Sequence, residues 1–257
     1  MNTRSLAALA LAAALTFGGA PARAIVGGGA PSADGLGRNV VTIVGSRGNF
    51  CSGTMIAPNI ALTAAHCVPN GSTYKIVEYD AQRTPQLRDI TQVATHPQFN
   101  LQTMLAHRAT ADVALLRVAS PIAAARQPPP LGTPLAGLSA GSRFAVAGIG
   151  VSVRGDGKSG GVVRAANLIA TGKPGTLQIR LIDPVAEGKR EGLGACTGDS
   201  GGPVFEDQQG RAVVIGVVSW STGPNGTAGC GGMTGVTPLS LYRDWILQTA
   251  RSWGAGL

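Results

Sequence analysis

Short runs of β-branched and apolar residues recur along this chain at intervals of roughly ten residues, and turn-forming glycine, proline and asparagine separate them. The clearest runs cover residues 40–44, 60–63, 75–79, 113–118, 144–148, 177–182 and 213–219. Runs of this length suit strands and are too short for most helices, so the pattern predicts an all-β sandwich or barrel. With 257 residues, the chain is long enough for one large or two small β domains with a real core.

The composition indicates a compact, loop-rich β protein. Hydrophobic residues make up 44% of the chain and charged residues only 13%, against about 25% in an average domain, and 38 residues are glycine. A proline cluster at residues 127–134 suits an ordered crossing between two halves. One packing helix is expected at the end of the chain, because a single helical face collects Tyr242, Trp245, Ile246, Thr249, Ala250 and Trp253.

Residues 1–24 have the pattern of a secretory signal peptide. Arg4 gives a positive start, an apolar run spans residues 6–17, and Ala22-Arg23-Ala24 fits the small-x-small cleavage pattern. Cleavage there would leave 233 residues (257 − 24) and predicts a secreted or periplasmic protein. No other stretch approaches the ~20 apolar residues of a membrane-spanning helix, so a membrane-embedded body is not expected.

Charge, histidines and cysteines limit the possible partners. The net charge is +8, but the basic residues are spread singly, which favours a solvated surface over a nucleic-acid site. His96 and His107 lie in loop-like stretches, and the three scattered histidines predict neither a metal site nor a cofactor. In an exported chain the four cysteines predict two disulfides, with three possible pairings.

Three segments contain the residue types of nucleophilic catalysis. Residues 197–203 read Thr-Gly-Asp-Ser-Gly-Gly-Pro, residues 62–67 read Leu-Thr-Ala-Ala-His-Cys, and residues 112–116 read Asp-Val-Ala-Leu-Leu. A serine hydroxyl is a weak nucleophile until a base accepts its proton, and histidine titrates close enough to neutral pH to be that base. A buried carboxylate then fixes the imidazole tautomer. The candidates for nucleophile, base and orienting acid are Ser200, His66 and Asp112.

These segments, in the chain order His, Asp, Ser, resemble those of the chymotrypsin-like (trypsin-fold) secreted serine peptidases, and the chain looks like a bacterial member. Ile-Val-Gly-Gly at residues 25–28 adds to the resemblance. It implies an all-β fold of two packed six-stranded antiparallel β-barrels with a C-terminal helix, and a site in the cleft between the barrels. The chain would divide into a signal peptide (1–24), an N-terminal barrel (25–130), a C-terminal barrel (131–238) and the helix (239–253). The expected protein is a monomer that needs no cofactor and acts on a protein or peptide substrate.

The resemblance also assigns supporting residues. The oxyanion donors would be the N–H groups of Gly198 and Ser200, and Ser219 corresponds to the residue that hydrogen-bonds the buried aspartate. The implied disulfides are Cys51–Cys67 and Cys196–Cys230. An α-ammonium on a new N-terminal Ile25 would pair with Asp199 and order the turn that carries the oxyanion donors. Because Ala24 ends the signal-like pattern, export itself would release that N-terminus.

The same resemblance places the substrate pocket at Gly194, Ser219, Trp220, Ser221 and Gly235. Trypsin-like members have a carboxylate at the pocket floor to pair with Lys or Arg, whereas Gly194 stands there in this chain, and residues 219–237 carry no charge. An unpaired cation buried there would cost several kcal/mol, so a neutral apolar residue is expected before the cleaved bond. Aromatic and small aliphatic side chains both stay open, because Ser221 narrows a wall that Gly235 leaves open.

Two other functions stay open. A catalytically silent homologue would act as a binding module, although such homologues usually lose the serine or the histidine, and this chain has both. An esterase would need a Gly-x-Ser-x-Gly turn that leads from a strand into a helix. Residues 198–202 have that spacing, but Pro203 and the β-type run after it contradict a helix.

Overall fold

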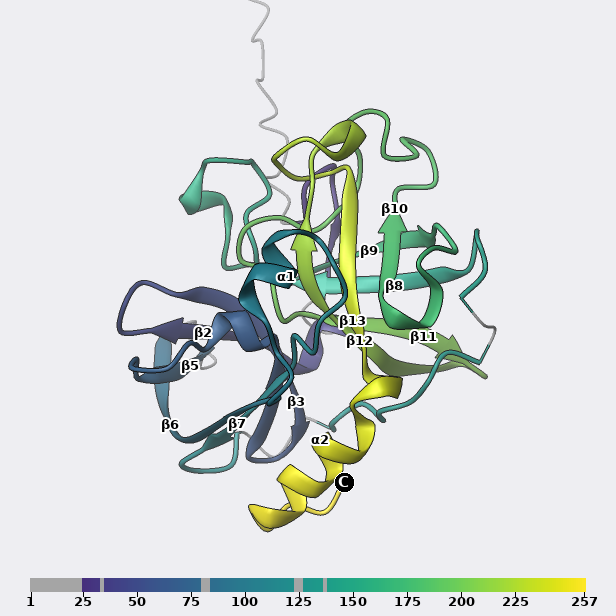
Figure 1. The fold of residues 1–257 in the computed structure, drawn as a ribbon. Helices are drawn as coiled ribbons and strands as arrows, with labels where there is room; N and C mark the ends of the chain where they lie inside the picture. Colours follow the sequence, from purple (N-terminus) through teal and green to yellow (C-terminus); the bar gives the residue numbers. More distant parts are fainter. Residues whose placement is uncertain (1–24, 33–34, 80–83, 123–126, 136–137) are drawn as a thin grey trace, which may run out of the picture.

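Two closed β-barrels lie side by side in the computed structural model of this protein (Figure 1), which describes residues 25–32, 35–79, 84–122, 127–135 and 138–257. The all-β prediction with two six-stranded antiparallel barrels and a C-terminal helix is confirmed. The expected signal peptide, residues 1–24, lies outside the described residues. Of the residues described, no helix combines the length and apolar character needed to cross a membrane.

The first barrel is made by the N-terminal half of the chain. Its strands, in hydrogen-bonded order, are β2 (Val40–Gly45), β3 (Phe50–Ala57), β4 (Ile60–Thr63), β7 (Ala114–Val118), β6 (Pro85–Thr95) and β5 (Tyr74–Tyr79), and the β2–β5 pairing closes the ring. Apolar residues from these strands fill the interior, and Ile43, Ile76 and Leu116 are each fully buried. The ladder that matters for the site joins β4 to β7, because Thr63 pairs with Ala114.

The second barrel follows in the C-terminal half. Its ring order is β8 (Arg143–Gly148), β9 (Arg164–Ala170), β10 (Ile179–Ile182), β13 (Met233–Pro238), β12 (Arg211–Ser221) and β11 (Pro203–Gln208), closed by pairing of β11 with β8. The short strand β1 (Ala30–Pro31) pairs with the start of β9. The core of this barrel includes the fully buried Val146, Leu181 and Ile215.

Helices are few. They are α1 (Leu101–Leu105) and α2 (Arg243–Ser252), with single 3₁₀ turns η1 (Leu36–Asn39), η2 (Ala65–Cys67), η3 (Gly157–Ser159), η4 (Gly175–Leu177), η5 (Pro224–Gly226) and η6 (Leu239–Leu241). Helix α2 leaves the second barrel and extends beneath the first barrel (Figure 1). Its buried residues Ile246 and Ala250 join one core cluster with Ile60 of the first barrel and Val214 of the second. The expected packing helix therefore packs on both barrels.

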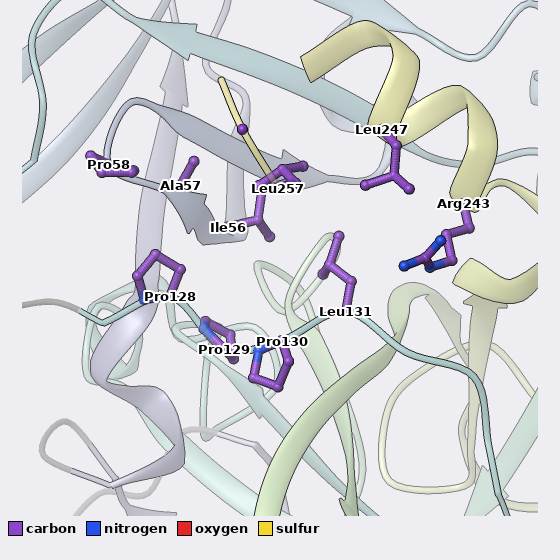
Figure 2. A pocket seen from close by; sticks show the side chains of 11 residues that line it. Ile56, Ala57, Pro58, Pro128, Pro129, Pro130, Leu131, Arg243, Leu247 and Leu257 are labelled. Atoms are coloured by element: carbon purple, nitrogen blue, oxygen red, sulfur yellow. The ribbon is translucent and has the colours of Figure 1, made fainter. Parts of the chain in front are cut away.

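The proline segment crosses between the barrels in an ordered form. The Asn39 side-chain amide donates to the Gln127 carbonyl (2.6 Å), and Val214 N–H donates to the Pro130 carbonyl (2.9 Å). Figure 2 shows Pro128–Pro130 facing Leu247 of α2 and Leu257 across a groove. These contacts hold the crossing against both barrels.

The sequence pattern places the start of one strand wrongly and misses several other strands. The run at residues 177–182 becomes a strand only from Ile179, because residues 175–177 form the η4 turn. Six of the described strands were not singled out by the pattern: β1, β3, β6, β9, β11 and β13. Three of them, β3, β9 and β13, are rich in small or hydroxyl residues, and β6 is largely polar and exposed.

Candidate active site

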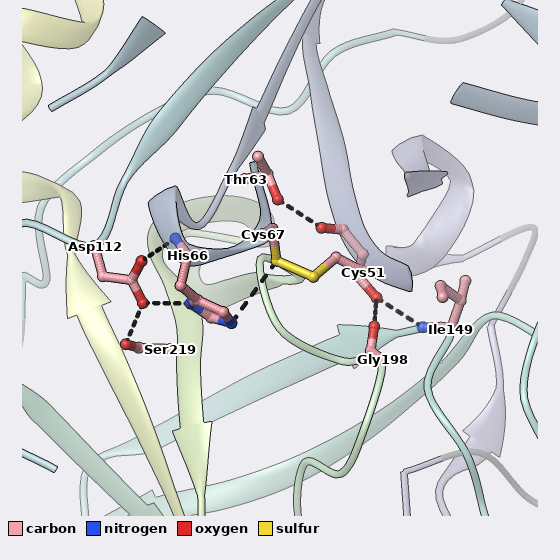
Figure 3. Close-up of a disulfide and its surroundings, with 9 residues drawn as sticks. Cys51, Thr63, His66, Cys67, Asp112, Ile149, Gly198 and Ser219 are labelled. Carbon is pink, nitrogen blue, oxygen red and sulfur yellow. Dashed lines mark hydrogen bonds and ion pairs between the residues drawn. A yellow bond between two sulfur atoms is a disulfide. The ribbon is translucent and has the colours of Figure 1, made fainter. Parts of the chain in front are cut away.

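His66 and Asp112 meet because β4 and β7 are neighbours in the first barrel. His66 lies in the η2 turn just after β4, and Asp112 lies just before β7. The Asp112 side chain is fully buried and accepts two hydrogen bonds from His66, one from its backbone N–H (2.9 Å) and one from Nδ1 (2.8 Å) (Figure 3). This contact makes Nδ1 the proton donor and leaves Nε2, 3.8 Å from the Cys67 sulfur, as the nitrogen with a free lone pair.

Ser219 contributes a third hydrogen bond to Asp112 from the other barrel. It lies near the end of β12, and its hydroxyl donates to Asp112 Oδ2 at 2.5 Å. Ser219 is 3% exposed and Asp112 is fully buried, so the hydrogen bond between them is shielded from water. These hydrogen bonds fix the orientation of the Asp112 carboxylate.

Ser200 lies in a tight turn that packs on the first barrel near His66. A Cβ on Gly201 would stand 2.1 Å from Thr63 Oγ1, so the Gly201 backbone lies directly against the strand that leads to His66. Within the described residues no hydrogen bond joins the Ser200 hydroxyl to His66, and Ser200 is half-buried. Catalytic hydrogen bonds are often long in the absence of substrate and shorten in the reacting complex.

The turn presents two backbone N–H groups without a partner among the described residues, those of Gly198 and Ser200. Gly198 has φ +95°, a conformation that a side chain strains, and a Cβ there would lie 2.9 Å from Gly150 Cα. Glycine is therefore required at this position. The two free donors lie on the same turn as the Ser200 hydroxyl.

Ser52 of β3 anchors this turn across the barrel interface. Its hydroxyl donates to the Gly198 carbonyl (2.8 Å) and accepts from the Ile149 N–H (3.0 Å) (Figure 3). Its own N–H donates to the Ser200 carbonyl (2.8 Å). Its carbonyl accepts from Thr63 Oγ1 (2.8 Å), and the residue is 0% exposed. The Ser200 N–H thus lies between two carbonyls that Ser52 holds in place. Sequence reasoning did not identify Ser52, because this role depends on contacts between distant segments.

Asp199 is fully buried beneath the turn without a cationic partner among the described residues. Its carboxylate accepts from the N–H groups of Gly150 (2.8 Å) and Cys196 (2.9 Å). Burial raises the pKa of Asp199 from its usual 3.8 to about 7, while the two N–H contacts act in the opposite direction. Ile25 is also fully buried and belongs to the core cluster of the second barrel. Among the described residues, no hydrogen bond or ion pair joins Ile25 to Asp199.

The two disulfides are Cys51–Cys67 in the first barrel and Cys196–Cys230 in the second, with Cα atoms 6.1 and 4.9 Å apart. Among the described residues, Cys51, Cys67 and His66 form one group whose potential metal-ligand atoms lie within 4.8 Å of one another. Because both sulfurs are oxidised, they are not the thiolates that bind metals. This group therefore offers no thiolate ligands.

The residues expected to form the pocket gather at the end of β12 and the start of β13. Trp220 pairs with Gly235, and Gly194 is linked to this region because the adjacent Ala195 N–H donates to Thr234 Oγ1 (3.0 Å). One expectation is wrong: Gly235 does not leave a wall open. A Cβ there would stand 2.1 Å from the Trp220 ring, because the indole lies flat on the glycine backbone.

The two remaining histidines both contact aromatic rings. His107 stacks on Trp220, with ring centroids 4.5 Å apart and planes 23° apart. His96 packs edge-on against Tyr242 and Trp245 near α2, and burial lowers its pKa. Neither role was expected from the sequence, which predicted that both are loop residues.

Comparison with known proteins agrees with this geometry. The family model Trypsin matches residues 26–246. Human Kallikrein-12 is 31% identical over 215 residues, covering 79% of this chain and 81% of the relative. Trypsin of Phaedon cochleariae is 28% identical over 215 residues, covering 77% and 78%. Human Serine protease 56 is 29% identical over 220 residues, but the chain spans only 34% of its length.

These relatives, from human, mouse and Phaedon cochleariae, give no support to the expectation of a bacterial secreted member. The matched region includes the segments of His66, Asp112 and Ser200 as well as strands of both barrels. The chain belongs to the Trypsin family of serine proteases.

Proposed function

We propose that this protein is a serine endopeptidase that cleaves peptide bonds through an acyl-enzyme on Ser200. The observation that carries the proposal is the fully buried Asp112, which binds His66 Nδ1 at 2.8 Å and leaves Nε2 as the basic nitrogen. Nε2 accepts the proton from the Ser200 hydroxyl as its oxygen attacks the substrate carbonyl. The imidazolium formed in this step is stabilised by the Asp112 carboxylate.

The unpartnered N–H groups of Gly198 and Ser200 receive the negative charge on the tetrahedral intermediate. In related sites, removal of one such donor costs about 3–4 kcal/mol of transition-state stabilisation. His66 then gives its proton to the leaving amine, and the C–N bond breaks. A water molecule repeats the sequence on the acyl-enzyme, which releases the second product and restores the Ser200 hydroxyl.

An extended substrate has a free strand edge beside Ser200. The β11–β12 ladder ends at the Pro203–Val217 pair. Two more hydrogen bonds follow, from Val218 N–H to the Gly202 carbonyl (2.9 Å) and from Gly201 N–H to the Val218 carbonyl (2.7 Å). Beyond them, residues 219–221 have a strand partner only on the β13 side among the described residues. A peptide pairs with this edge through main-chain hydrogen bonds. With Gly194 at the pocket floor, the residue before the cleaved bond is neutral and apolar.

Release of Ile25 as a new N-terminus completes the site. In the uncleaved chain, the raised pKa of Asp199 means that the folded state keeps a proton which the unfolded state loses between pH 4 and 7. The free energy of unfolding therefore falls by about 4 kcal/mol as the pH rises from 4 to 7. An α-ammonium on Ile25 would supply the missing positive charge and lower the pKa of Asp199. Cleavage after Ala24 on export to the periplasm or beyond would generate this group.

Labelling with a serine-directed fluorophosphonate tests the function directly. The protein that begins at Ile25 should be labelled once, at Ser200, and the Ser200→Ala variant should stay unlabelled, while Ser139→Ala serves as a serine control with normal labelling. A peptide library should then show cleavage after neutral apolar residues. Absence of labelling would favour a silent binding module, and labelling with ester but no peptide turnover would favour an esterase. Cleavage mainly after Lys or Arg would contradict the pocket assignment.

A further inference from the structure

The Trp220 indole is enclosed by residues from three different segments. His107, from the loop that leads to Asp112, stacks on the ring at 4.5 Å, and the Gly235 backbone lies against it. The Arg180 guanidinium carbon is 5.6 Å from the ring centroid. Trp220 is only 7% exposed as a result. The three side chains of His107, Trp220 and Arg180 are called the indole cluster below.

Strand register explains why Arg180 reaches the indole. Arg180 on β10 pairs with Gly235 on β13, and Gly235 pairs with Trp220 on β12. Directly paired residues of antiparallel strands point their side chains to the same face of the sheet. Because Gly235 has no side chain, the side chains from the two flanking strands meet over it. The indole cluster therefore lies on one face of the β10–β13–β12 sheet, next to residues 219–221.

The Arg180 side chain is held in place but keeps unused hydrogen-bond donors. Its Nε donates to Gln178 Oε1 (3.1 Å), and its Nη2 donates to the His107 carbonyl (3.1 Å). Gln178 is 3% exposed, so the guanidinium is fixed from a buried side. Arginine has five N–H donors, and these two contacts leave Nη1 without a partner among the described residues.

The charge of Arg180 is not compensated locally. Within the described residues no Asp or Glu lies within 4.0 Å of its guanidinium, whereas other cations such as Lys75 and Arg88 do have acidic partners. A pre-positioned guanidinium with free donors binds carboxylates in preference to neutral groups. The half-buried position beside an aromatic ring reduces screening by water.

We propose that the indole cluster is a cationic subsite that selects an Asp or Glu side chain of the substrate two to four residues before the cleaved bond. This inference rests on the proposed peptidase function, because a substrate paired with residues 219–221 carries its upstream side chains past Trp220 to Arg180. The competing explanation is that Arg180 has only a structural role and holds the His107 loop against the second barrel. The two explanations differ in whether the effect of Arg180 depends on substrate charge.

The test compares peptides that differ only by Glu or Gln. A set with one apolar residue before the cleaved bond carries Glu or Gln at each of the three upstream positions in turn, and kcat/KM is measured. One position should favour Glu by about tenfold, the size expected for a charged hydrogen bond in a partly exposed site. The preference should shrink as salt is raised from 50 to about 500 mM, because screening weakens it.

Variants of Arg180 distinguish a substrate-binding role from a purely structural role. Arg180→Gln should bring the Glu/Gln ratio to about one with little change for the Gln peptides, and Arg180→Lys should keep part of the preference. Arg117→Gln is the matched control, since Arg117 also donates to a glutamine, Gln92 (3.0 Å), but on the first barrel. The Arg117→Gln variant should leave the Glu/Gln ratio of kcat/KM unchanged.

Two results would overturn the inference: a ratio near one at all three positions in the native protein, or an equal loss on Glu and Gln peptides in Arg180→Gln. Fluorophosphonate labelling of each variant separates this failure from failure of the proposed function. A protein that labels at Ser200 but shows no Glu preference refutes only the subsite. A native protein that does not label refutes the peptidase proposal itself.

Discussion

Replacing Ser52 with alanine probes how the oxyanion turn is held. The substitution removes a hydroxyl that donates to the Gly198 carbonyl and accepts from the Ile149 N–H, both buried contacts. A buried polar group left without a partner costs about 1–3 kcal/mol, so we expect the two orphaned groups to lower stability by about 3 kcal/mol. In a protein of this size that corresponds to a fall in Tm of about 6–12 °C.

The same change should reduce turnover. The Gly198 carbonyl would lose its anchor, and the adjacent oxyanion donors would be less well placed. Complete loss of one donor costs about 3–4 kcal/mol, so partial misplacement is expected to lower kcat by about tenfold with little change in KM. Steady-state kinetics on one apolar peptide ester and one amide, with thermal unfolding of the same samples, measure both effects.

Thr54→Val is the matched control. Thr54 lies two residues further along β3, is equally buried, and its hydroxyl has no hydrogen-bond partner among the described residues. Removing that hydroxyl should be neutral or stabilising, because a buried polar group without a partner is replaced by a methyl group. If Ser52→Ala and Thr54→Val have the same Tm and kcat, the anchoring role of Ser52 is refuted.

Three further outcomes are expected. Asp112→Asn should fold normally yet lose about 10⁴-fold in kcat, through the wrong histidine tautomer, and near-normal turnover would remove Asp112 from the mechanism. A protein that keeps Ala24 should lose about 4 kcal/mol of stability between pH 4 and 7, as the buried Asp199 with a pKa of about 7 is forced to ionise. A protein that begins at Ile25 should not, and identical pH–stability curves would argue against the ion pair. Gly198→Ala should abolish peptide cleavage, because its Cβ would stand 2.9 Å from Gly150 Cα at φ +95°; active Gly198→Ala enzyme would contradict the tight turn.

Strands with strong local signals were predictable, and strands without them were not. The runs at residues 40–44 and 213–219 are rich in valine and isoleucine, and both are strands. Strand β3 reads Phe-Cys-Ser-Gly-Thr-Met-Ile-Ala, and its glycine and hydroxyl residues resemble a loop. It is a strand because seven of its eight residues are buried between neighbours, which is a tertiary effect that overrides local propensity.

The site divides in a similar way. His66, Asp112 and Ser200 were identified because each lies in a short segment with a recognisable pattern. Ser52, His107 and Arg180 were not, because their roles come from contacts between residues 70 to more than 140 positions apart. The expectation that Gly235 leaves a pocket wall open was wrong for the same reason. The room that the missing side chain creates is filled by the Trp220 ring.

The position of α2 has a consequence for the order in which the protein assembles. Ile246 and Ala250 complete a cluster that also contains Ile60 from the first barrel and Val214 from the second. On a ribosome the first barrel emerges long before α2, so its α2-facing apolar surface stays uncovered while the second barrel is still being made. Exposed apolar surface of this kind favours aggregation and chaperone binding during synthesis. The site between the barrels therefore matures late, when the last helix has docked.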